Sequence, residues 1–156
     1  MKIEALLDSN VLIAMFVEAH EHHGPSLALV SDGSIQFAIA VHSYAEAYST
    51  LTRRGDRAPF QFTPQEAWAA LESVRAVTTL VGLTAPQTFD AIRGYAQSGG
   101  IGARLYDRLI GEAAVAHGIA RIVTWNVGHM RGLFPNLNVE TPKEFGKGPA
   151  AASAGQ

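Results

Sequence analysis

The amino-acid sequence predicts an α/β fold, a three-layer α/β/α sandwich around a mainly parallel sheet of four to five strands. Short apolar segments alternate with longer segments of helical character along the chain, which is typical of parallel βαβ units. With 156 residues and 47% apolar composition, the chain fits one domain with a single core. Right-handed crossovers in such units send the carboxyl ends of all strands to one edge of the sheet.

The composition narrows the classes of function. A net charge of -2 argues against a broad basic face that wraps a polyanion. The absence of cysteine excludes disulfides, thiolate catalysis and cysteine zinc sites, and it suits a reducing compartment, so we expect a cytoplasmic protein. No secretory signal is visible, because Asp8 interrupts the apolar run after Lys2. We also expect no membrane span, because the apolar run at residues 11–17 is too short.

The first elements follow from apolar patterning and from turn residues. Residues 2–7 form an expected strand that runs into Asp8, and an apolar helix at 11–17 follows at once. Pro25 is expected to open a second helix, which ends near Gly33. Asp8 therefore stands where a strand ends and a helix begins, at the edge where parallel sheets bind ligands.

Three histidines, His20, His22 and His23, lie between these two helices. His20 and His23 are three residues apart, but a third ligand with clear spacing is lacking, so a solvated loop is favoured over a metal site.

Residues 34–40 read as the second strand, followed by a helix at 42–54 that Gly55 closes. Ser43 and Glu46 have the spacing of a helix-capping box, which needs no ligand. Glu46 also lies in the first turn of a helix that follows a strand, at the same edge as Asp8. Both interpretations of Glu46, capping residue and metal ligand, stay open at this point.

The remaining elements complete the alternation. Thr63 and Thr84 are the helix start signals in this part of the chain. The expected elements are, in order, a helix from 63 to 76, a strand at 77–83, a helix from Thr84, a glycine-rich break at 99–102, a helix at 103–117, a strand at 119–124 and a short strand near Val139. The domain should span residues 1–145, and residues 146–156 should form a disordered tail.

Two further polar residues occupy notable places in this second half. Asp107 lies one turn into the helix at 103–117, where pairing with Arg104 or Arg108 at the surface is an alternative role. Asn126 follows a strand, either as an ordinary turn residue or as a functional one. Together with Asp8 and Glu46, these side chains should gather at one edge of the sheet. Three carboxylates in one pocket repel each other unless a cation neutralises them, and Mg²⁺ or Mn²⁺ suits oxygen ligands.

At this point the sequence resembles the PIN-domain ribonucleases, and within them the VapC-type toxins of bacterial toxin–antitoxin pairs. The resemblance covers about residues 1–143, and four motifs in this order carry it: Leu7-Asp8-Ser9-Asn10-Val11-Leu12, Ser43-x-x-Glu46, Arg104-x-x-Asp107-Arg108-Leu109-Ile110 and Thr124-Trp125-Asn126-Val127-Gly128-His129-Met130. It implies a PIN-like sandwich in which Asp8, Glu46 and Asp107 bind metal. Asn126 matches a fourth catalytic position at which aspartate is common.

The resemblance also implies an activity and partners. We expect a metal-dependent endoribonuclease that uses Mg²⁺, which Mn²⁺ can replace, to hydrolyse single-stranded or looped RNA. We further expect a cognate VapB-type antitoxin and a homodimer. Substrate contacts are expected from polar residues of the pocket and from nearby arginines, namely Asn10, Thr124, Arg104, Arg108 and Arg131.

Two other functions remain as alternatives. A PIN-like domain with weak catalysis, used as a binding module, is compatible with the neutral amide of Asn126. A phosphohydrolase of the haloacid-dehalogenase type is disfavoured, because that pattern requires aspartate at the position of Asn10.

Overall fold

A computed structural model describes residues 2–147 of the chain, and it confirms the predicted α/β class. The sheet has five parallel strands in the order β3-β2-β1-β4-β5. The elements run along the chain as follows: β1 (Ile3–Leu7), α1 (Ser9–Phe16), α2 (His23–Ser31), β2 (Gln36–Ala40), α3 (Val41–Thr52), α4 (Pro64–Arg75), β3 (Thr79–Val81), α5 (Ala85–Gln97), α6 (Arg104–Ala116), β4 (Arg121–Val123), α7 (Val127–Leu133) and β5 (Asn138–Glu140). Residues 142–147 add a final helical segment.

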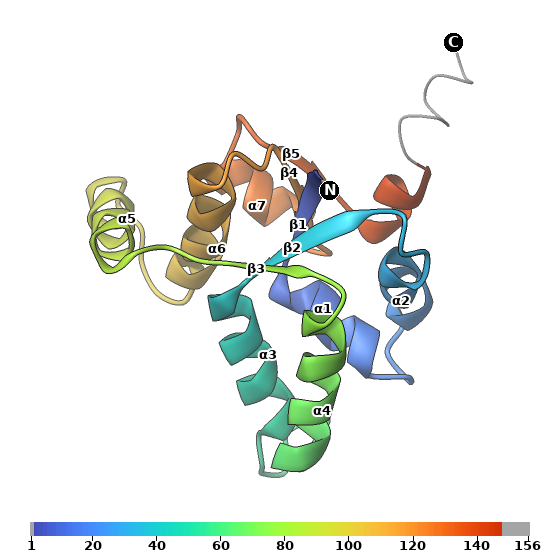
Figure 1. Ribbon diagram of the computed structural model, residues 1–156. Helices are drawn as coiled ribbons and strands as arrows, with labels where there is room; N and C mark the ends of the chain where they lie inside the picture. Colours follow the sequence, from blue (N-terminus) through green and yellow to red (C-terminus); the bar gives the residue numbers. More distant parts are fainter. Residues whose placement is uncertain (1, 148–156) are drawn as a thin grey trace.

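Strand β1 lies at the centre of the sheet, where the order of the strands reverses direction (Figure 1). It pairs with β2 on one side and with β4 on the other. Ligands of open parallel sheets bind at such a reversal, beyond the carboxyl ends of the strands. The topology therefore points to the connection that follows Leu7 as the place to search for a site.

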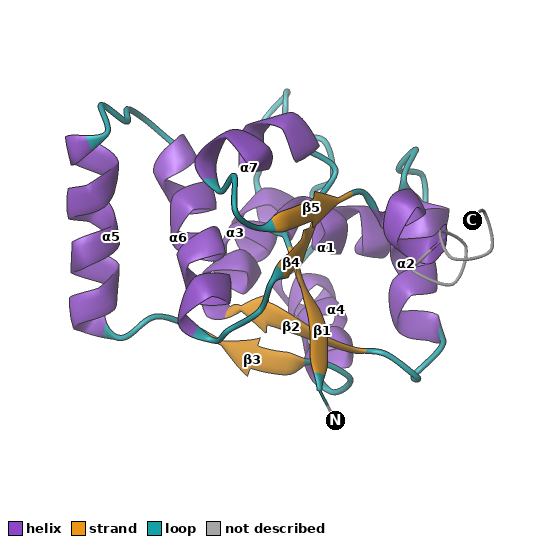
Figure 2. Cartoon of the chain, turned by 90° about the horizontal axis from the view of Figure 1, so that it is seen from above, coloured by secondary structure: helices purple, strands orange, loops and turns teal. Residues whose placement is uncertain are grey.

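The helices cover the two faces of the sheet in two groups. Alternate strand residues point to opposite faces, so Ala5 and Leu7 pack with α1, α2 and α4, whereas Leu6 packs with α6 and α7. Helix α5 lies outermost and packs on α6 rather than on the sheet (Figures 1 and 2). The result is the expected three-layer arrangement, with one additional helix outside it.

Close packing through a glycine brings α7 against α6. A side-chain carbon placed at Gly111 of α6 would overlap the ring of Phe134, which lies at the end of α7. Phe134 is buried, and Met130 of α7 belongs to the same core cluster. This close approach sets the position of α7 relative to the first turn of α6.

Some local predictions are confirmed and others are wrong. Thr63 and Thr84 cap α4 and α5, each in a reciprocal capping box. Of the two interpretations left open for Glu46, the capping box with Ser43 is wrong, because β2 continues directly into α3 and places Ser43 inside the helix, with Ala40 as its N-cap. Helix α7 was not predicted, because Gly128 and Gly132 lower the helical propensity of this segment.

The predicted disordered tail begins at residue 146, and its part from 148 onward lies outside the described residues. Within residues 2–147, no helix combines the length and the apolar character needed to cross a membrane.

Candidate functional site

Asp8 lies at the end of the central strand and is almost completely buried. One carboxylate oxygen, Oδ1, accepts a hydrogen bond of 2.7 Å from the backbone N–H of Ser9 and so caps α1. The other, Oδ2, accepts a hydrogen bond of 2.8 Å from the hydroxyl of Thr124. Burial raises the pKa of Asp8 to about 6, and the nearby Asp107 carboxylate adds to this rise.

Thr124 and Asn10 hold the segment after β4 against the start of α1. The Thr124 hydroxyl oxygen accepts hydrogen bonds of 3.0 Å from the Asn10 side-chain amide and from the backbone N–H of Asn126. The Asn10 side-chain oxygen accepts one of 3.0 Å from the backbone N–H of Trp125. Both residues therefore lie at the site as expected. Because Thr124 is fully buried, its visible role is to orient Asp8.

Glu46 projects from α3 toward the same edge of the sheet. Its Oε1 atom is buried and has no hydrogen-bond partner among the described residues. Burial raises the pKa of Glu46 to about 7, and the negative charges of Asp8 and Asp107 contribute. The nearest base is His42, whose Nε2 lies 3.7 Å away and whose own pKa is lowered by burial. Glu46 is thus no capping residue but an acid without a counter-charge.

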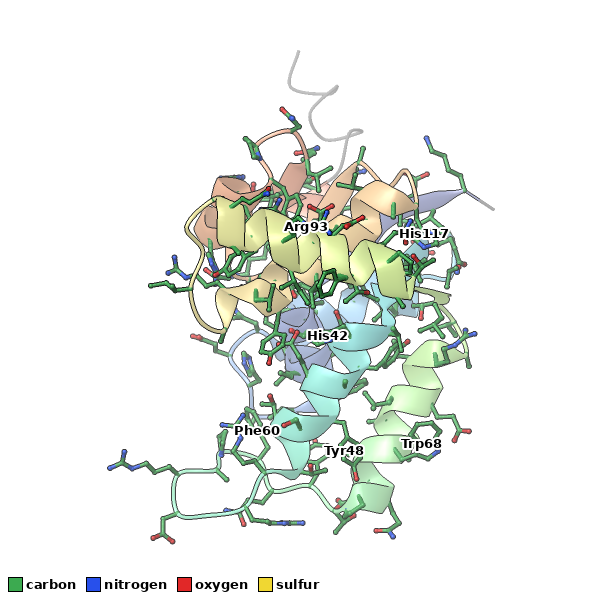
Figure 3. The ribbon with its side chains drawn as sticks, turned by 90° about the vertical axis from the view of Figure 1, so that its left-hand side faces the viewer. His42, Tyr48, Phe60, Trp68, Arg93 and His117 are labelled. Atoms are coloured by element: carbon green, nitrogen blue, oxygen red, sulfur yellow. The ribbon has the colours of Figure 1, made fainter. Side chains whose placement is uncertain are left out.

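His42 also marks the wall of the site on the α3 side. It lies at the start of α3, below α5 and α6, whereas Tyr48 and Trp68 lie toward the opposite end of the α3–α4 pair (Figure 3). The His42 ring stacks on Tyr106 of α6 with ring centroids 5.0 Å apart. This stack joins the helix that carries Glu46 to the helix that carries Asp107.

Asp107 lies in the first turn of α6 and contacts a residue that sequence reasoning missed. Burial raises the pKa of Asp107, while His129 and Arg104 oppose the rise. The Nδ1 atom of His129 lies 2.9 Å from Oδ2 of Asp107 and 3.2 Å from Nδ2 of Asn126. One nitrogen cannot donate to the carboxylate and accept from the amide at once, so the two contacts are alternatives set by the tautomer.

His129 belongs to the motif at residues 124–130, but the sequence predicts no helix there and so indicates no role for it. The spacing of three residues between Asn126 and His129 was the available signal, since residues three apart share a helix face. Asn126 itself is exposed at the start of α7, adjacent to Asp107 through His129. All four predicted acid and amide positions therefore lie around the carboxyl ends of β1 and β4.

The donor set suits a hard cation, although the side chains do not enclose one. The Asp107 carboxylate adds to the raised pKa of Asp8, and Asp8 and Asp107 add to that of Glu46, so the three acids lie close enough to interact. Their oxygen donors suit Mg²⁺ or Mn²⁺. Between residues 2 and 147, no three acidic or histidine side chains converge tightly enough to count as a preformed metal site. The unpartnered Glu46 oxygen is a group that a cation would satisfy.

The three arginines proposed for substrate binding occupy different surroundings. Arg104 is exposed beside Asp107. Arg108 is half-buried, and its Nε donates a hydrogen bond of 2.9 Å to Glu112. Arg131 lies on the other side of α7 from His129, where its Nη2 donates to the backbone oxygen of Val139 at 2.9 Å. The structure brings Arg104 near Asp107, holds Arg108 against Glu112 and directs Arg131 toward β5.

The histidines around the start of α2 are each held by neighbouring groups. The backbone N–H of His22 donates to Nδ1 of His20 at 3.0 Å, and Nδ1 of His23 contacts the backbone oxygen of Ala14 at 3.0 Å. The His22 ring stacks on Trp125, with centroids 3.8 Å apart and planes 9° from parallel. The expected solvated loop is therefore only partly correct, because all three histidines are half-buried and His23 is the first residue of α2.

Comparison with known proteins decides the family. The family model described as "PIN domain" matches residues 5–127, which is more than half of the chain. The chain belongs to the PIN-domain family. A search of curated proteins finds no sequence match for this PIN domain.

Solved structures similar to this PIN domain include toxins and toxin–antitoxin complexes. DNA-bound VapBC from Salmonella typhimurium shares 19% identity and a TM-score of 0.64, over 90% of this chain and 99% of that one. VapBC2 from Rickettsia felis, bound to a promoter DNA fragment, shares 19% identity and a TM-score of 0.61, over 89% and 98%. VapC20 from Mycobacterium tuberculosis, described as a sarcin-ricin loop cleaving toxin, shares 17% identity and a TM-score of 0.60, over 76% and 87%. At these identities the likeness establishes the fold.

Proposed function

We propose that this PIN domain is a metal-dependent endoribonuclease that hydrolyses single-stranded or looped RNA. The observation that carries the proposal is the carboxylate cluster at the carboxyl edge of the sheet, in which Asp8 is buried and Glu46 and Asp107 are half-buried. Asp8 and Glu46 have raised pKa values, and a buried oxygen of Glu46 lacks a partner. Such a cluster is unstable as a set of bare charges and favourable around a divalent cation.

Asp8, Glu46 and Asp107 would hold the ion, with Mg²⁺ as the cofactor and Mn²⁺ as a substitute. The bound ion would supply charge neutralisation at the phosphate and Lewis-acid activation of the attacking water. Asp8 is fixed for this task by its hydrogen bonds from Ser9 and Thr124. The Asn126–His129 pair adjoins Asp107 and would offer N–H donors to the phosphate.

We further propose that the protein is the toxin of a type II toxin–antitoxin pair in the cytoplasm, with a cognate VapB-type antitoxin as its partner and a homodimer as its assembly. The support is the fold that it shares with VapC20 and with the toxin–antitoxin complexes of Salmonella and Rickettsia.

Substitution of the acids tests the nuclease proposal. Asp107→Asn and Asp8→Asn should abolish RNA cleavage in Mg²⁺ and relieve growth inhibition, while circular dichroism shows that the fold survives. Glu18→Gln is a matched control, because Glu18 is an exposed acid that follows the C-terminal end of α1, the end opposite Asp8. Full RNA cleavage by either aspartate variant would refute the proposal that these acids hold the catalytic metal.

A second candidate is a PIN-like binding module with weak catalysis. The observation that favours it is that the described acids do not converge into a preformed metal site. Calorimetric titration of the purified protein with Mn²⁺ near neutral pH separates the two. Binding that is lost in Asp8→Asn supports the nuclease, and no binding in the unaltered chain supports the module.

A further inference from the structure

A groove of about 580 Å³ adjoins the acidic cluster. Its lining residues come from the N-terminal half of α6, from α7, and from the end of α5 with the segment that connects α5 to α6. Its basic lining residues are Arg104, Arg108 and His129. No acidic residue is among the described residues that line it, so the groove presents positive and neutral groups only.

Glycines create the hollow on both of its sides. Gly128 and Gly132 are one turn apart on α7, and a side-chain carbon at either would meet no atom within 4 Å. On the opposite wall, a side-chain carbon at Gly100 would overlap the ring of Tyr95. The Tyr95 hydroxyl donates a hydrogen bond of 2.8 Å to the backbone oxygen of Ile101, which holds this wall in place. The groove is therefore open on the α7 side, where Gly128 and Gly132 carry no side chain, and is bounded on the other side by the Tyr95 ring packed on Gly100.

The groove leads to the acids through two of its own residues. His129 lines it and contacts Asp107 at 2.9 Å. Arg104 also lines it, is exposed, and lies close enough to influence Asp107 electrostatically. Arg108 is oriented by Glu112 and by the Phe134 ring, which lies 5.6 Å from its guanidinium carbon. A ligand in the groove would thus meet the guanidinium groups of Arg104 and Arg108 and then the carboxylate cluster.

We propose that this groove binds the sugar–phosphate backbone of single-stranded RNA beside the bond that is cleaved. The inference rests on the proposed nuclease function and adds the path of the substrate. Guanidinium groups bind phosphate oxygens in a bidentate manner, which Arg104 and Arg108 would do here. The bare helix surface at Gly128 and Gly132 lets the backbone approach α7 closely.

Filling the groove tests this proposal without using catalysis. Gly132→Leu places a side chain into the open space, and its helical backbone accepts an L-residue without strain. Ala69→Leu is the matched control, because it adds the same side chain to an exposed position of α4, a helix that does not line the groove. The probe is a fluorescein-labelled single-stranded RNA of random sequence, and the readout is fluorescence anisotropy in EDTA.

Gly132→Leu should raise the Kd for this RNA roughly tenfold, whereas Ala69→Leu should leave it unchanged. Arg104→Gln should weaken binding and reduce the slope of log Kd against log salt by about one phosphate contact. Thermal unfolding of Gly132→Leu should not fall below that of the unaltered chain, because leucine favours helix more than glycine does.

The results separate this proposal from the nuclease proposal. The proposal that the groove binds RNA is refuted if the unaltered chain does not bind the RNA, or if Gly132→Leu binds it with unaltered affinity. Unaltered affinity in Gly132→Leu is also the result expected if the groove binds a protein segment instead of RNA. If the unaltered chain binds RNA without cleaving it, and Gly132→Leu loses this binding, the nuclease proposal is refuted and the proposal that the groove binds RNA is supported.

Discussion

Glu46→Gln should stabilise the metal-free protein above neutral pH. Glu46 has an ordinary pKa of 4.5 that rises to about 7 in the fold, and its side chain is 30% exposed. A rise of that size corresponds to about 3 kcal/mol, which solvent around the exposed part reduces to about 1–2 kcal/mol. Glutamine keeps the shape and removes the charge, and the substitution breaks no hydrogen bond found among the described residues.

The sign of the pH dependence follows from proton binding. The folded state holds the Glu46 proton more tightly than the unfolded state, so the unaltered chain loses stability as pH rises from about 4.5 to about 7. Glu46→Gln lacks this loss. The two proteins should therefore be equally stable near pH 4.5 and should differ by about 1–2 kcal/mol at pH 8.

Urea unfolding in EDTA at both pH values measures this difference, and thermal unfolding at pH 8 should show a rise in Tm of about 2–8 °C. Glu18→Gln is the control for removal of one exposed charge. A Glu46→Gln variant that is less stable than the unaltered chain at pH 8 would refute the reasoning, because it would mean that the carboxylate makes a favourable contact. With Mn²⁺ present, the unaltered chain should recover stability and the variant should recover less.

The remaining predictions concern other contacts of the site. Thr124→Val removes the hydroxyl between Asp8 and Asn10, so it should lower the free energy of unfolding by about 1–3 kcal/mol in urea and reduce cleavage. Gly111→Ala should cost about 1–3 kcal/mol by the same assay, because its methyl group overlaps Phe134. Mn²⁺ affinity, measured by calorimetry from pH 5 to 8, should rise with pH, because protons on Asp8 and Glu46 compete with the metal; a flat profile would contradict the raised pKa values.

The acids could be located from the sequence because the parallel topology brings strand ends and helix starts to one edge of the sheet. Asp8 follows a strand that the apolar pattern marks clearly, and parallel connections send later strand ends to the same edge. The role of Glu46 could not be decided in this way, because Ser43 and Glu46 have the spacing of a capping box wherever the helix begins. In the structure α3 begins directly after β2, at Val41, so Ser43 lies inside the helix and cannot be its N-cap.

His129 shows what local reasoning cannot supply. Its position depends on α7, a helix whose two glycines disfavour helix formation locally and whose stability comes from packing. That packing depends on Gly111 and Phe134, which are far apart in the sequence and meet only in the tertiary structure. The groove has the same origin, since it is defined by which positions lack side chains after α6 and α7 have come together.

The outermost position of α5 has a consequence for hydrogen exchange. Because α5 packs on α6 and not on the sheet, it can detach without exposing the central core, so its amides should exchange in a local opening that leaves β1 and β4 protected. Tyr95 of α5 is tied to Ile101 by its hydroxyl, so the same opening would release one wall of the groove. Exchange rates in α5 would then report on access to the groove.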